Sequence, residues 1–83
     1  MLDYYDIALL VYPDVTISQL RQIAKQIYSL GVGIDWPSAE IGEYGLYLVA
    51  QYPNTIKWRD LEKGLSEIDG LVIDYETMRD WDE

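Results

Sequence analysis

The chain contains no cysteine and no histidine among its 83 residues. The absence of cysteine excludes disulfide bonds and thiolate chemistry, and it fits a protein of a reducing compartment such as the cytoplasm. Soft metal sites need cysteine or histidine, and so do the commonest nucleophile and base pairs of hydrolytic enzymes. We therefore expect a protein that is not an enzyme and that carries no cofactor or metal.

Long apolar runs and basic residues are also scarce. No apolar stretch approaches the roughly 20 residues that cross a bilayer, and the acidic N-terminus is unlike a secretory signal peptide. Six Lys and Arg stand against fifteen Asp and Glu, for a net charge of -9. Because nucleic acids and anionic lipids both attract basic proteins, this charge argues against direct binding to either. It favours a basic partner or simple solubility.

The longest apolar run is Ile7–Tyr12, which is bounded by Asp6 and by Pro13. A strand at the surface of a sheet alternates apolar and polar residues, and this run does not. We interpret it as a central strand that is covered on both faces.

The rest of the chain alternates between helical and strand periodicity. Thr16 and Gln19 stand three residues apart, as in a capping box, and apolar residues then recur at helical spacing as far as Leu30. Gly31 and Gly70 follow the two predicted helices, where glycine commonly ends a helix. The pattern predicts strands over 7–12, 32–36, 46–52 and 71–77, helices over 16–30 and 55–69, and a hairpin connection over 38–45.

This order predicts a single α+β domain over residues 1–83, with an acidic C-terminal tail at 78–83. Two interleaved β-α-β units give the ferredoxin-like β-α-β-β-α-β sandwich, a four-stranded antiparallel sheet with two helices on one face. The first and third strands lie in the centre of that sheet, and the second and fourth lie at its edges. The other sheet face, which we call the open face, is left without a helix.

Side-chain alternation predicts an apolar open face ringed by carboxylates. Exposed apolar patches of this kind usually mark contact surfaces. Three occupants remain open: the tail or the 38–45 hairpin of the same chain, a second copy in a homodimer, or a different partner. The residues predicted to point to this face are Ala8, Leu10, Tyr12, Asp35, Tyr47, Val49, Gln51, Val72, Asp74 and Glu76.

Charge is also unevenly distributed along the chain. Five of the six basic residues lie in the two predicted helices, against four of the fifteen acidic ones. Clustered carboxylates repel one another and cost stability, so a chain that keeps them either uses them for binding or gains solubility from them.

The chain is short and acidic, and it contains eight tyrosines and three tryptophans. In these respects it resembles the small phage anti-defence proteins, among them many anti-CRISPR proteins and DNA mimics. The resemblance implies an inhibitor in the host cytoplasm whose carboxylates occupy the nucleic-acid-binding surface of a basic protein, with aromatic side chains as anchors. Trp81, flanked by two aspartates, is the leading anchor, unless it clamps the tail to the domain. The predicted partner-binding residues are Tyr12, Asp35, Glu40, Glu43, Tyr47, Asp74, Glu76, Asp80, Trp81, Asp82 and Glu83.

Two other families share the predicted topology. RNA-recognition motifs stack bases on central-strand aromatics, but they need basic residues where this chain offers Asp35, Asp74 and Glu76. The run from Ala8 to Asp14, the helix that follows and Gly33-Ile34-Asp35 are similar to the layout of ACT domains, which sense amino acids and usually pair side by side. The loop after the first strand lacks the glycine usual in that family. This resemblance implies, as the alternative function, a regulatory ligand-binding or dimerisation module.

Overall fold

The computed structural model describes residues 2–82, so Met1 and Glu83 lie outside the described residues. The chain is α+β, with a four-stranded antiparallel sheet and three helices. The elements in chain order are β1 (Tyr4–Val11), α1 (Ile17–Ser29), β2 (Gly33–Gly42), β3 (Gly45–Pro53), α2 (Trp58–Ser66), β4 (Leu71–Ile73) and α3 (Tyr75–Trp81).

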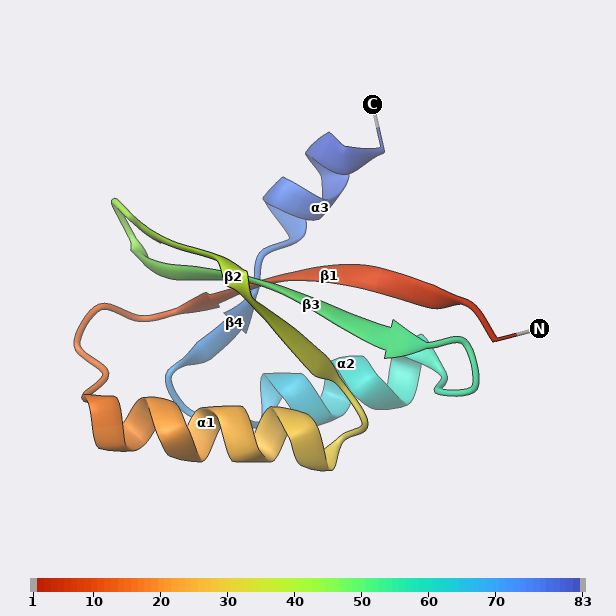
Figure 1. Cartoon of the computed structure of the whole chain (residues 1–83), viewed down its shortest axis with the longest axis horizontal. Coiled ribbons are helices and arrows are strands. Elements are labelled where there is room, and N and C mark those ends of the chain that lie inside the picture. Colours follow the sequence, from red (N-terminus) through yellow and green to blue (C-terminus); the bar gives the residue numbers. More distant parts are fainter. Residues whose placement is uncertain (1, 83) are drawn as a thin grey trace.

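The sheet separates two unequal layers of helix. The strand order is β2-β3-β1-β4, so β1 and β3 are central, as the sequence predicts. Both α1 and α2 cover one face, and α3 rises from the opposite one (Figure 1). The open face therefore carries a helix that the sequence analysis does not foresee.

The core lies between the sheet and the first two helices. Ile7, Leu9 and Val11 of β1 are buried there, as their alternation predicts. They pack with buried residues of the neighbouring strand and of both helices, namely Leu48, Ala50, Ile23, Ile27, Leu61 and Leu65. Each of these side chains is at most 4 % exposed, so the small core is closely packed.

The predicted capping box of α1 is confirmed. The Thr16 hydroxyl accepts a hydrogen bond from the Gln19 amide at 3.1 Å, and the Thr16 amide donates to the Gln19 side chain at 2.8 Å. These bonds satisfy amide groups that the first turn of a helix leaves unpaired. The apolar repeat of this helix starts in the sequence at Ile17, and its spacing predicts that this residue shares the buried face. Ile17 is instead 74 % exposed, and the core contacts begin one turn later, at Leu20.

The second strand is longer than predicted. Instead of a strand over 32–36 and a connection over 38–45, β2 continues to Gly42 and only a tight turn separates it from β3. Pairing with β3 breaks after Asp35 and resumes at Glu40. Pro37 lies in this bulge, where its missing N–H removes no rung from the ladder. The bulge therefore lets one edge strand contain a proline and still reach the turn.

The second helix is shorter than the predicted span of 55–69. The Ile56 amide bonds the Pro53 carbonyl in a turn before the helix, and Lys57 occupies the N-cap position. After Ser66 the amides of Glu67 and Ile68 bond carbonyls three residues back. These bonds are of the tighter 3₁₀ type. Gly70, which has a left-handed φ of 84°, then changes the direction of the chain before β4.

The predicted strand over 71–77 is wrong beyond Ile73. In the β1–β4 register Leu9 faces Ile73, so a longer strand would set Glu76 opposite Asp6. Like charges directly opposite each other destabilise a strand pair. Asp74 instead caps a helix, as its carboxylate accepts bonds from the Thr77 amide at 3.1 Å and the Thr77 hydroxyl at 2.6 Å. Residues 75–81, part of them predicted to be tail, form α3.

We expect Gly45→Ala to destabilise the fold by at least about 2 kcal/mol. Alanine would be strained at the positive φ of this position, and its Cβ would collide with the backbone of the neighbouring strand. Gly45 has a φ of 142°, and a Cβ there would lie 2.1 Å from the carbonyl oxygen of Val11. Gly33→Ala is the matched control, since a Cβ at Gly33 meets nothing within 4 Å. We expect it to change the unfolding free energy by less than about 0.5 kcal/mol. Urea unfolding of both variants measures the difference, and equal losses would contradict the argument.

Candidate functional site

The open face is built from alternate residues of three strands. Ala8 faces Val49, which faces Asp35, and Leu10 faces Tyr47, which faces Glu40. Each row thus runs from an apolar centre on β1 to a carboxylate on the β2 edge. The sequence predicts the row that ends at Asp35, whereas it places Glu40 in the hairpin connection. Glu40 reaches this face only because β2 continues to Gly42.

The bulge in β2 is what brings both carboxylates to this face. Asp35 and Glu40 are five residues apart, so in a regular strand they would point to opposite faces. Their partners Val49 and Tyr47 are only two apart, so the bulge absorbs the difference. The Ser38 hydroxyl donates to the Asp35 carboxylate at 2.6 Å, which ties the bulge together.

Asp74 fixes α3 to the centre of the open face. Its amide donates to the Ala8 carbonyl at 2.9 Å as the last rung next to β4, while its carboxylate caps the helix. One residue later, the Tyr75 hydroxyl donates to the Glu62 carboxylate of α2. Ala8 is therefore only 3 % exposed, although its side chain points away from α1 and α2. The prediction of a face without a helix is corrected, because α3 covers its middle.

Two hollows of similar size lie beside α3. The bulge-side hollow, of about 450 Å³, has Ala8 and Val49 in its floor. Around that floor it is lined by Ser38, Glu40, Tyr47, Asp74, Thr77 and Trp81. The hairpin-side hollow, of about 490 Å³, has Leu10 and Val72 in its floor and is lined by Tyr44, Tyr47, Asp74, Tyr75, Glu76 and Asp80. Each hollow therefore combines an apolar floor with carboxylates and an aromatic ring.

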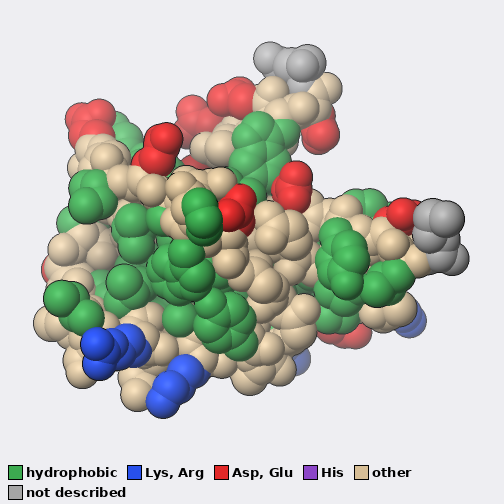
Figure 2. Space-filling view, in the orientation of Figure 1, with side chains coloured by type: hydrophobic (Ala, Val, Ile, Leu, Met, Phe, Trp, Pro, Cys, Tyr) green, Lys and Arg blue, Asp and Glu red, His purple; other side chains and the backbone are tan. Residues whose placement is uncertain are grey.

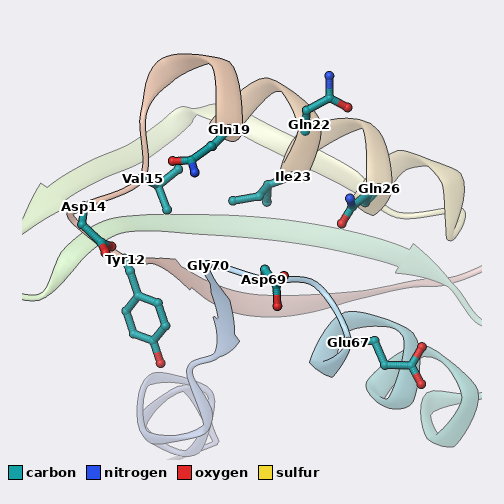
Figure 3. A pocket seen from close by; sticks show the side chains of 10 residues that line it. All are labelled: Tyr12, Asp14, Val15, Gln19, Gln22, Ile23, Gln26, Glu67, Asp69 and Gly70. Carbon is teal, nitrogen blue, oxygen red and sulfur yellow. The ribbon is translucent and has the colours of Figure 1, made fainter.

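Six of the predicted partner-binding residues are brought together here. They are Glu40, Tyr47, Asp74, Glu76, Asp80 and Trp81. Asp35 stands on the same face beside Val49, and the Tyr12 ring points away from α1 (Figure 3).

The remaining predicted residues lie apart from the hollows. Glu43 is exposed in the β2–β3 turn and lines neither of them. Asp82 is the C-cap of α3, and Glu83 lies outside the described residues.

The sequence analysis missed several residues of the site. Tyr44 and Tyr75 line the hairpin-side hollow, Ser38 lines the bulge-side hollow, and Thr77 lines both. Asp6 also belongs to the open face, two residues before Ala8 on β1. Strand alternation could have identified Asp6, whereas the other four depend on the bulge and on α3.

The charge of the molecule is separated between its two sides. Red acidic side chains gather in the upper part of Figure 2, around α3 and the β2–β3 hairpin, while blue basic side chains lie along the lower edge, over the helical layer. Both basic residues of α1, Arg21 and Lys25, are exposed there. The open face is therefore predominantly acidic, although α3 itself carries a basic residue, Arg79.

A third hollow lies on the helical side of the sheet. This polar hollow, of about 460 Å³, lies between α1 and the loop that joins α2 to β4 (Figure 3). Gln19, Gln22 and Gln26 line it from α1, and Glu67 and Asp69 line it from the loop. The Gln19 amide oxygen already bonds the Thr16 amide. Figure 3 shows Gln22 pointing away from the loop opposite and Gln26 pointing toward it, so Gln26 is the amide side chain best placed to meet a ligand.

Within residues 2–82, no group of three or more acidic side chains is arranged to hold a metal ion. No helix in this part of the chain is long and apolar enough to cross a membrane. Comparison with family models, curated proteins and solved structures finds no match to the chain. The geometry of the open face is thus the observation on which a functional proposal rests.

We expect the Tyr75–Glu62 contact to stabilise the protein below about pH 10 and to fail above it. The hydrogen bond to Glu62, followed by burial, raises the pKa of Tyr75 above the usual 10.0. A raised phenol pKa favours the neutral form in the folded state, so the stabilisation is lost as pH rises through that pKa. Urea unfolding at several pH values should therefore show wild type and Tyr75→Phe converging above pH 10. Tyr44→Phe on the hairpin is the control, and a constant difference between wild type and Tyr75→Phe would contradict the expectation.

Proposed function

We propose that the protein is a non-catalytic inhibitor that binds the basic, nucleic-acid-binding surface of another protein through its open face. One observation carries the proposal: carboxylates and aromatic rings surround α3 on the side of the sheet away from the basic helices. Protein interfaces are enriched in tyrosine, tryptophan and arginine. A partner rich in arginine would supply the complementary side chains.

The two hollows suggest how such a partner is held. An arginine side chain has an apolar stem and a planar cation, and it stacks on aromatic rings as well as pairing with carboxylates. In the bulge-side hollow its stem would lie on Ala8 and Val49, and its guanidinium would meet Glu40 and the ring of Trp81 or Tyr47. Because Trp81 is 44 % exposed, binding would also remove apolar surface from water.

In this proposal the carboxylates take the place of nucleic-acid phosphates. Basic residues of the partner would pair with them and release the counterions that nucleic acid would otherwise displace. Direct binding of nucleic acid to this face is disfavoured by the same charge. A homodimer through the open face is less favoured than a heterologous partner, because α3 interrupts the flat surface that two sheets would share and because both copies are acidic.

At the level of family, we propose a ferredoxin-like sandwich with an added third helix. The antiparallel order β2-β3-β1-β4, with α1 and α2 on one face, supports this proposal. Together with size and charge, it favours a small phage anti-defence protein of the anti-CRISPR or DNA-mimic type. Such a protein would act in the cytoplasm of the host.

Neutralising the acids beside α3 should weaken binding to a basic partner. The test variant combines Glu40→Gln, Glu76→Gln and Asp80→Asn. The control combines Asp14→Asn, Glu67→Gln and Asp69→Asn, which removes the same charge from the polar hollow. We expect affinity for a ten-residue arginine peptide to fall about tenfold in the test variant, since exposed ion pairs contribute about 0.2–1 kcal/mol each. Calorimetry at low and high salt measures both variants.

Capture from a host lysate then tests the biological part of the proposal. Immobilised wild type and control should retain a nucleic-acid-binding protein that duplex DNA displaces, and the test variant should not. If both variants lose binding equally, net charge alone is responsible and the acidic face serves only solubility. If neither loses it, the open face is not the binding surface.

The polar hollow favours a second candidate function, an ACT-like module that binds a small ligand. Its glutamines lie on α1, and its carboxylates come from the loop after β1 and the loop before β4. Amide and carboxylate groups can pair with the carboxylate and ammonium of an amino acid. We expect calorimetry against the common amino acids to give heat with one of them, and Gln22→Ala together with Gln26→Ala to abolish it. Absence of heat with every amino acid would remove this candidate.

A further inference from the structure

The central strand β1 is paired along only part of one side. Its whole length, Tyr4 to Val11, pairs with β3. On the other side only Leu9–Val11 pair with β4. Figure 1 shows β1 running to the right, past the short arrow of β4. A stretch of central strand is therefore left with a vacant edge.

The backbone bonds identify which groups face that edge. The Asp3 carbonyl accepts the Asn54 amide, so odd-numbered residues of β1 bond toward β3. The Ala8 carbonyl accepts the Asp74 amide and the Tyr12 amide donates to the Gly70 carbonyl, so even-numbered residues bond toward β4. Tyr4 and Asp6 thus direct an N–H and a C=O each toward the vacant edge, and Leu2 lies next in the same series.

No other segment of residues 2–82 pairs with β1 at this position. Residues 74–77 would have to extend β4, and that extension would set Glu76 opposite Asp6. The chain instead leaves the sheet at Asp74 and enters α3. The repulsion that ends β4 therefore also creates the vacancy.

The other edges of the sheet are protected, and this one is not. The bulge with Pro37 interrupts β2, and β4 is only three residues long. Short, bulged or proline-bearing edges resist pairing with other chains. Along the vacant edge, Leu2, Tyr4 and Tyr5 are each more than half exposed. Such an edge is a template for another strand.

The side chains beside the edge specify what that strand should carry. On the open face lies the Asp6 carboxylate, two residues before Ala8 on β1. On the helical face lies an aromatic cluster, in which Tyr5 and Tyr52 stand 5.4 Å apart and Tyr52 and Trp58 stand 5.8 Å apart. Alternate residues of an added strand would meet carboxylate on one face and aromatic rings on the other.

We propose that residues 2–6, which lead into β1 and include its first residues, are a strand-addition site for an extended segment of a partner protein. In that segment lysine or arginine alternates with apolar residues. Main-chain bonds to Tyr4 and Asp6 hold the segment, the Asp6 carboxylate selects its basic residues, and Tyr5 receives its apolar ones. A second copy of this chain fits less well, since each copy carries a net charge of -9. The site is separate from the hollows beside α3, so it extends beyond the proposed function and does not depend on it.

The test uses the whole protein and an eight-residue peptide of alternating lysine and valine. On adding the peptide we expect the Tyr4 and Asp6 amides to exchange with deuterium at least tenfold more slowly, as measured by NMR, and amides of the β2 bulge to stay unchanged. Tyr4→Pro removes an N–H that the sheet itself does not use and should lower peptide affinity at least tenfold. Tyr4→Val keeps that N–H and is the matched control. Circular dichroism checks that both variants fold.

A charge exchange keeps the test decisive if Tyr4→Pro fails to fold. We expect Asp6→Lys to bind a glutamate–valine peptide and to reject the lysine–valine one, the reverse of wild type. The proposal is overturned if the peptide binds without protecting either amide, or if it changes the NMR signal of the Trp81 indole N–H instead. Either result leaves the proposed function of the open face standing. A third outcome would also overturn the proposal. If light scattering shows that the free protein is a dimer, and NMR shows that the Tyr4 and Asp6 amides are already protected without peptide, the edge pairs with a second copy.

Discussion

The architecture depends on the point at which the fourth strand stops. Asp74 is at once the last residue bonded to β1 and the cap of α3. A capping carboxylate contributes about 0.5–2 kcal/mol, and the alternative, a longer strand, would oppose Glu76 to Asp6. Both effects act in the same direction, so the chain turns off the sheet after three residues of β4.

This early turn has consequences on both sides of the sheet. It sets α3 across the middle of the open face, where Ala8 becomes buried and two hollows form beside the helix. It also leaves the first half of β1 without a neighbour on one side. None of the residues of α3 is buried, so the helix is held by its cap, by Tyr75 and by contacts with β1 rather than by a core of its own.

The separation of charge follows from the same layering. The two helices that cover the core, counted with the N-cap residue of α2, carry five of the six basic residues, and the sixth, Arg79, lies on α3. Most of the acids lie outside α1 and α2, although α2 and the loop after it also expose Asp60, Glu67 and Asp69. A small domain has limited buried surface from which to offset repulsion among clustered carboxylates. Carboxylates also lie on the helical side, at Asp14, Glu67 and Asp69. The tyrosine and tryptophan rings beside α3, and not charge alone, therefore distinguish the open face from the rest of the surface.

The sequence by itself determined the elements whose signals are local. The apolar run of β1, the Thr16–Gln19 capping box and the alternation of β3 predicted the central strands, the first helix and the buried side of the sheet, because periodicity and caps act over a few residues. Only the tertiary structure decided the bulge that brings Asp35 and Glu40 to one face, and the conversion of 75–77 from strand to helix. Both depend on which residue of a distant strand lies opposite, Tyr47 in one case and Asp6 in the other, and pairing between distant strands leaves no local pattern to detect.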